Sequence, residues 1–186
     1  MADELYLSLW LPDFRAGQMV RHYEKMVRQF PFSQLRPGIS LLRAYVLEFA
    51  EPPVMEVSFS ESPSLEEVFR MARRFDQADC ALEIEGWWDL WQYEQEWRLW
   101  PAHVGLFCFG PAFDSGEKDH LRIDLGIDSL YLPEPGVPLS GRKAQSNLKG
   151  LIRLVHELDR VLRPAERRLW LESGEDFAGR LEDAVS

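Results

Sequence analysis

The spacing of apolar residues along this chain changes between the two-residue period of a strand and the helical period of about 3.6 residues. Apolar and more polar residues alternate over residues 5–11, which predicts a first strand. Residues 16–30 carry a helical stripe of apolar side chains, and Asp13 stands where an N-cap is expected. Residues 41–49 and 54–59 are rich in β-forming residues and are separated by a short Pro-containing connection, so they predict a hairpin.

A second helix and a fourth strand follow this hairpin. Ser64 and Glu67 form a capping-box pattern, which predicts a helix over residues 65–75. Alternating apolar and acidic residues then predict a strand over residues 80–85. The resulting order, βαββαβ, is that of the ferredoxin-like arrangement, in which two helices cover one face of an antiparallel sheet and leave the other open.

The second half of the chain predicts more of the same architecture. Strands are expected over residues 104–109 and 121–127, and the longest helical stripe ends at Leu162, just before Pro164. Residues 168–172 predict a last short strand, followed by a short helix. We therefore expect an α+β protein whose antiparallel sheet has a ferredoxin-like N-terminal half, is extended by further strands and is covered by a long C-terminal helix.

Composition bounds the class of protein. A chain of 186 residues with 46% hydrophobic content can bury one core, so residues 1–186 are expected to form a single globular domain. The formal charge of −10 opposes binding to nucleic acid or an anionic membrane and favours a cationic partner. No signal-peptide pattern and no membrane-spanning apolar run appear, and Cys80 and Cys108 sit in apolar segments as packed thiols do. These features predict a cytoplasmic protein with neither nucleic acid nor membrane as a partner.

Tryptophan is concentrated in one short segment of the chain. Five of the seven tryptophans lie there, interleaved with acidic residues; they are Trp87, Trp88, Trp91, Trp97 and Trp100. Aromatic side chains offer large contact areas, so such a cluster forms either part of a core or a recognition surface. If the fourth strand continues, Trp87 and Trp88 point to opposite faces and only part of the cluster can enter one core. The remainder is then expected to form an exposed anchor for a basic protein partner or a self-association patch, or else to pack along a long edge connection.

A second group of candidate residues lies on the polar face of the predicted sheet. Alternation places three carboxylates, an imidazole and a guanidinium there, from Glu83, Glu85, His120, Arg122 and Asp124. Such groups suit the binding of a cation, an amine or a sugar, and acid–base chemistry where burial shifts a carboxyl pKa. They also suit a solvated sheet face with surface ion pairs, and the sequence leaves both interpretations open.

No motif in the chain names a reaction. The four histidines show none of the common metal-ligand spacings, so no metal or cofactor is expected, and no nucleophile motif is present. We therefore favour a non-enzymatic interaction protein that uses its acidic, tryptophan-rich surface to engage a basic protein partner or its own copy. The alternative is an enzyme or small-ligand binder with a carboxylate and histidine cleft on the open face of the sheet.

Overall fold

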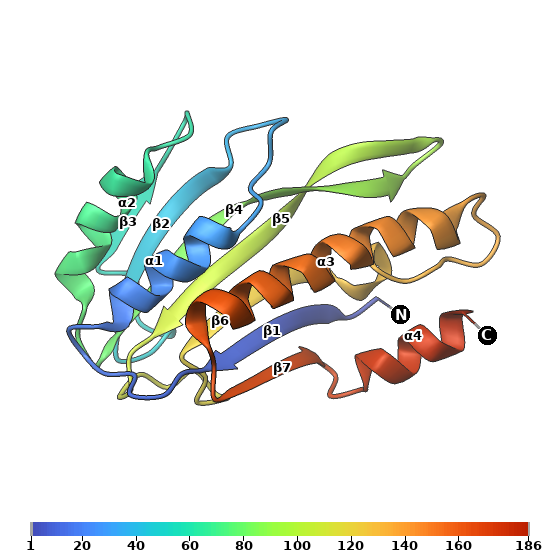
Figure 1. Cartoon of the computed structure of the whole chain (residues 1–186). Coiled ribbons are helices and arrows are strands. Elements are labelled where there is room, and N and C mark those ends of the chain that lie inside the picture. Colours follow the sequence, from blue (N-terminus) through green and yellow to red (C-terminus); the bar gives the residue numbers. More distant parts are fainter. Residues whose placement is uncertain (1, 186) are drawn as a thin grey trace.

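The computed structural model describes residues 2–185 and shows an α+β fold built on one seven-stranded sheet (Figure 1). Every neighbouring pair of strands is antiparallel. In spatial order, the sheet consists of β3 (Met55–Ser58), β2 (Ile39–Val46), β4 (Cys80–Tyr93), β5 (Trp97–Phe109), β6 (Leu121–Ile127), β1 (Glu4–Trp10) and β7 (Glu166–Leu171).

Helices α1 (Met19–Gln29) and α3 (Ser140–Leu162) lie side by side against one face of the sheet (Figure 1). Helix α2 (Leu65–Ala72) continues as a short 3-10 turn, and its Phe69 packs edge-on against Tyr23 of α1. Helix α4 (Phe177–Val185) follows β7 beyond the end of the sheet. The core between sheet and helices is aliphatic and aromatic, and no helix of the described chain covers the opposite face (Figure 1).

The ferredoxin-like pairing expected for the N-terminal half is not confirmed. The element order βαββαβ is present up to β4, and β2 and β3 form the predicted hairpin. In a ferredoxin-like sheet the first strand pairs with the third and fourth, whereas here β1 pairs with β6 and β7. The hairpins β4–β5 and β5–β6 separate β1 from β2 and β3, because element order along a chain does not determine which strands become neighbours.

Two helix caps show where local sequence signals hold and where they fail. The Ser64 hydroxyl accepts a hydrogen bond from the Glu67 N–H at 3.2 Å, so the predicted cap of α2 is confirmed. Asp13 does not cap α1; the Asp76 carboxylate accepts from the N–H groups of Gly17, Met19 and Val20 at 2.8, 3.2 and 3.3 Å. Asp76 is distant in sequence, so only the tertiary fold could bring it to this helix end.

Strands β4 and β5 are much longer than the sequence predicted. They contain 14 and 13 residues and include all five tryptophans of the segment. Pairing of β4 with β2 extends only to Gly86, and pairing of β5 with β6 extends only to Gly105. The outer half of the β4–β5 hairpin therefore projects past the neighbouring strands, alongside the start of α3 (Figure 1).

Candidate binding surface on the β4–β5 hairpin

Strand alternation divides the tryptophans between the two faces of the hairpin. Trp88 is only 6% exposed and joins the core, where its ring lies 5.5 Å from Phe30 and 6.4 Å from Tyr131 between centroids. Trp87 points to the opposite face, where the Arg36 guanidinium lies 3.9 Å from its ring centroid. The prediction that only part of the cluster enters the core is thus consistent with the burial of these two neighbours.

Trp91 and Trp97 hold the hairpin against the start of α3. The Lys143 ammonium lies 3.2 Å from the centroid of the Trp91 ring, a cation–π contact. The Trp97 indole N–H donates to the Pro138 carbonyl at 2.6 Å, and its ring lies 5.3 Å from Tyr93. Both rings are half-buried and act as supports for the hairpin.

The Asn147 side chain closes the outer edge of β4. Its Oδ1 accepts from the Trp91 N–H at 2.9 Å, and its Nδ2 donates to the Trp91 carbonyl at 2.9 Å and to the Leu130 carbonyl at 2.7 Å. One carboxamide thus replaces the peptide group of a neighbouring strand. Asn147 is 4% exposed, and nothing in its local sequence marks it for this role.

The far end of the hairpin exposes apolar and acidic side chains together. Trp100 is 57% exposed and Leu99 is 42% exposed. The loop between the strands adds the exposed carboxylates of Glu94 and Glu96, of which Glu96 pairs with Arg98 at 2.6 Å. This end of the hairpin is the part of the tryptophan segment that remains accessible.

The outer edge of β5 lacks a neighbouring strand beyond Gly105. The Phe109 N–H donates to the His120 carbonyl, so alternate residues of β5, counted back from Phe109, direct their backbone groups away from β4. Leu99 and His103 are among these residues. The pairing of β6 with β5 ends before Gly126, whose φ is +77°. Within residues 2–185, the outward backbone groups of Trp97 and Leu99 have no hydrogen-bond partner, whereas the His103 carbonyl lies next to Gly126, 3.6 Å from where a Cβ on that glycine would stand. Such an edge is a template for a further strand.

On the open face of the sheet, a network of ion pairs surrounds Glu83 and Glu85. Arg43 pairs with Glu85 at 2.8 Å and with Glu56 at 2.6 Å. The Tyr45 hydroxyl donates to Glu83 at 3.0 Å, yet burial raises the pKa of Glu83 above its ordinary value. The imidazole nearest to these carboxylates belongs to His103, 3.4 Å from Glu85, and the sequence did not single it out.

His120 does not join this face. Its ring stacks on Phe14 at 4.3 Å, and its Nδ1 accepts from the Leu11 N–H at 2.9 Å. Burial lowers the pKa of His120. The predicted row of His120, Arg122 and Asp124 is therefore divided. His120 precedes the first residue of β6, and its side chain lies near α1, where the His22 ring is 5.9 Å from Phe14 between centroids.

Arg122 on β6 lies on the open face but is held by neighbouring groups. It pairs with the buried Asp119 at 2.7 Å and donates to the Ser115 carbonyl at 3.0 Å. The Ser8 hydroxyl donates to the same Asp119 at 2.7 Å and accepts from the Trp170 indole at 2.9 Å. Because these groups already bind its guanidinium, Arg122 forms a structural ion pair and is not free to bind an anion.

Asp124 is the more isolated carboxylate of this face. It accepts from the Gly126 N–H at 2.9 Å, but burial raises its pKa above the ordinary value. Asp124 and Glu85 flank Gly105 in register, and an added Cβ on Gly105 would lie 2.9 Å from the Phe107 ring. The Phe107 ring therefore occupies the space over Gly105.

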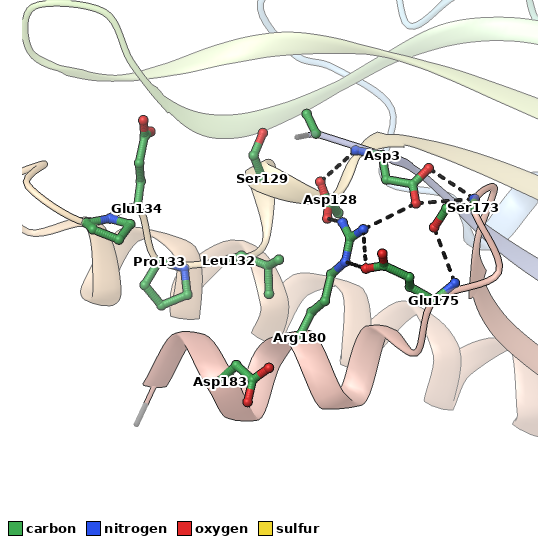
Figure 2. Close-up of a pocket in the computed structure, with 12 residues that line it drawn as sticks. Asp3, Asp128, Ser129, Leu132, Pro133, Glu134, Ser173, Glu175, Arg180 and Asp183 are labelled. Carbon is green, nitrogen blue, oxygen red and sulfur yellow. Dashed lines mark hydrogen bonds and ion pairs between the residues drawn. The ribbon is translucent and has the colours of Figure 1, made fainter.

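A recess of about 880 Å³ lies where the two chain termini come together, between η2 (Asp128–Leu130), the loop after it and α4. Figure 2 shows that Arg180 of α4 points toward Asp128, Asp3 and Glu175. Arg180 forms ion pairs with Asp128, with Glu175 at 2.5 Å and with Asp3 at 3.6 Å. One wall of the recess thus carries a guanidinium whose counterions are already in place.

Across the described residues, no three His, Cys, Asp or Glu side chains are grouped so that they could hold a metal ion. No helix in that same part of the chain has both the length and the apolar content needed to cross a bilayer. Comparisons with protein-family models, with curated proteins and with solved structures found no match.

Proposed function

We propose that this protein is a non-enzymatic interaction module that binds a protein partner through the outer half of its β4–β5 hairpin. The observation that carries the proposal is the unpaired outer edge of β5, flanked by the exposed side chains of Leu99 and Trp100. A protein rarely leaves a long apolar strand edge uncovered, because such an edge pairs readily with other chains.

The charge of the molecule favours a basic partner. The formal net charge is −10, and Glu94 and Glu96 lie at the tip of the hairpin. Complementary charge speeds association and disfavours partners of like sign. The same charge disfavours nucleic acid and anionic membranes as ligands.

The test is affinity capture of the tagged protein from its source cells, comparing the natural chain with Trp100→Ala. We expect the natural chain to retain one stoichiometric basic protein, and the variant to bind it about 30-fold more weakly, as for an interface hot spot of about 2 kcal/mol. Ile152→Ala, which removes an exposed apolar side chain from α3, is the matched control and should retain the partner.

Identical capture by Trp100→Ala and the natural chain would contradict the proposal, provided that circular dichroism shows both to be folded. If the natural chain is recovered alone, sedimentation over a range of concentrations decides whether the partner is a second copy. Concentration-dependent assembly that is lost in Trp100→Ala would support self-association through the same surface.

A second candidate function is small-ligand binding on the open sheet face. It is favoured by the raised pKa values of Glu83 and Asp124 and by the contact of His103 with Glu85. Displaced carboxyl pKa values occur at functional sites, although structural ion pairs also produce them. Compared with the sequence-based hypothesis, His103 takes the place of His120.

Titration of the carboxyl carbons by NMR tests this second function. We expect Glu83 and Asp124 to titrate above ordinary carboxyl values and Asp124→Asn to leave the Glu83 titration in place. If neither group has a displaced pKa, the open face has no special acid–base chemistry and this candidate function is removed.

A further inference from the structure

The two edges of the projecting hairpin differ in how their backbone groups are satisfied. On the β4 side, the Trp87 N–H donates to the Gly38 carbonyl and the Trp87 carbonyl accepts from the Ser33 N–H. Further out, Asn147 bonds both backbone groups of Trp91. On the β5 side, the chain supplies no such cover to Trp97 or Leu99 within the described residues.

We infer that the outer edge of β5 accepts an extended, basic segment of a partner protein as an added β-strand. The inference rests on the proposed function and specifies how the partner is recognised. Backbone hydrogen bonds to Trp97 and Leu99 supply the pairing, and the neighbouring side chains select the sequence of the segment. The added strand takes the place beside β5 that β6 leaves at Gly126.

The position of Pro101 is typical of a strand edge that can bind a partner but resists edge-to-edge aggregation. Pro101 lies opposite Asp89 in a row whose backbone groups point away from β4, so its missing N–H costs the hairpin no internal hydrogen bond. The same proline interrupts the outer row of donors. Proline on an edge strand is one of the devices by which proteins limit edge-to-edge aggregation.

A second copy of this chain is a poorer occupant than a basic segment. Two copies each carry a formal charge of −10, and their tips would bring like charges together. Two-fold pairing would also place Pro101 on both strands, so two donors rather than one would be absent from the shared ladder. A segment rich in Lys or Arg avoids both costs and meets the carboxylates of Glu94 and Glu96.

The side chains of β5 indicate the pattern of the segment. Successive residues of a strand point to opposite faces, so Trp97 and Leu99 flank the new strand on one face and Arg98 and Trp100 flank it on the other. Both faces offer an aromatic ring for packing. We therefore expect a segment in which β-branched or aromatic residues alternate with basic ones.

The experiment selects binders from a displayed library of random short peptides on the immobilised full-length protein. We expect the selected peptides to be basic and β-forming, and to lose affinity as the salt concentration rises. Leu99→Pro should weaken their binding about tenfold, the loss expected when one interchain hydrogen bond is removed. Leu99→Thr is the control, because it removes the leucine side chain but keeps the outward N–H.

Hydrogen exchange measured on the complex locates the added strand. The amides of Trp97 and Leu99 should exchange fast in the unbound protein and slowly with the selected peptide bound. The amide of Trp91, already bonded to Asn147, should change little and serves as the internal reference.

The results of these experiments distinguish a failure of strand addition from a failure of the proposed function. If selected peptides bind Leu99→Pro and Leu99→Thr equally, or leave the β5 amides unprotected, strand addition is overturned while binding at the hairpin stands. If no peptide is selected but a captured partner still depends on Trp100, strand addition is overturned and the proposed function survives. If neither library nor capture yields a binder and sedimentation shows no assembly that depends on Trp100, both fail.

Discussion

Asn147 illustrates how a single residue decides the shape of a surface. Its carboxamide bonds the backbone of Trp91 on β4 and of Leu130 after β6, so it joins three parts of the chain from one position on α3. Because these backbone groups are withdrawn from water, they need a partner inside the protein. The side chain thereby keeps β4 closed to other strands and leaves β5 as the open edge of the hairpin.

Replacing Asn147 by Ala should lower the free energy of unfolding by about 3 kcal/mol, since buried backbone groups lose their partners. Denaturant unfolding measures the change. Gln145→Ala, at an exposed position of the same helix, is the control and should be close to neutral. Equal stability of Asn147→Ala and the control would show that water replaces the carboxamide at no cost.

At the scale of elements, the chain relies on contacts between distant segments to complete its helix ends. Helix α1 begins after Gln18, whose side chain makes no capping hydrogen bond. The Asp76 carboxylate supplies the cap from the end of η1 (Arg73–Phe75) and ties α1 to the turn before β4. A carboxylate at this helix end also interacts favourably with the helix dipole.

Asp76→Ala should therefore destabilise the protein by about 1 kcal/mol, and by no more than about 2 kcal/mol. Asp13→Asn tests the cap that the sequence suggested and keeps a residue that tolerates the left-handed backbone at φ +55°. We expect Asp13→Asn to leave the thermal midpoint unchanged. A larger loss for Asp13→Asn than for Asp76→Ala would reverse the assignment.

At the scale of the whole molecule, the two ends of the chain meet at Arg180. Asp3, just before β1, accepts from the Ser173 N–H after β7, and Arg180 of α4 reaches both Asp3 and Asp128. Hydrogen bonding from Ser173, with a smaller contribution from the charge of Arg180, lowers the pKa of Asp3 below its ordinary value. This cluster attaches α4 to the sheet (Figure 2).

A carboxyl group whose pKa is lower in the folded than in the unfolded protein stabilises the fold at any pH above its unfolded pKa. This stabilisation is lost as the pH falls through the folded pKa. We therefore expect α4 to loosen as the pH falls below about 4, the ordinary range of an Asp carboxyl. Hydrogen exchange of residues 177–183 as a function of pH measures this. Arg180→Gln should loosen α4 already at neutral pH, and Arg142→Gln, at an exposed position, should not.

The hydrophobic periods of the sequence predicted most helices and strands. They did not predict the features that depend on contacts between distant segments. Strand β4 was expected to end near Ile84, and it continues to Tyr93 because β5 pairs with it along its whole length. The candidate residues were identified in part: Glu83, Glu85, Arg122 and Asp124 lie on the open face, whereas His120 lies apart and His103 was overlooked. Pro101 within a β-forming run was a local sign of an edge strand.

The sequence by itself determined the α+β class, the cap at Ser64 and the opposite directions of Trp87 and Trp88, since these depend on residues that are neighbours along the chain. Only the tertiary structure decided that β1 lies between β6 and β7, that Asp76 caps α1 and that Asn147 closes β4. It also decided that β5 keeps an open edge. Strand order and edge coverage depend on which distant segments pack together, and periodicity within one segment carries no information about its partner.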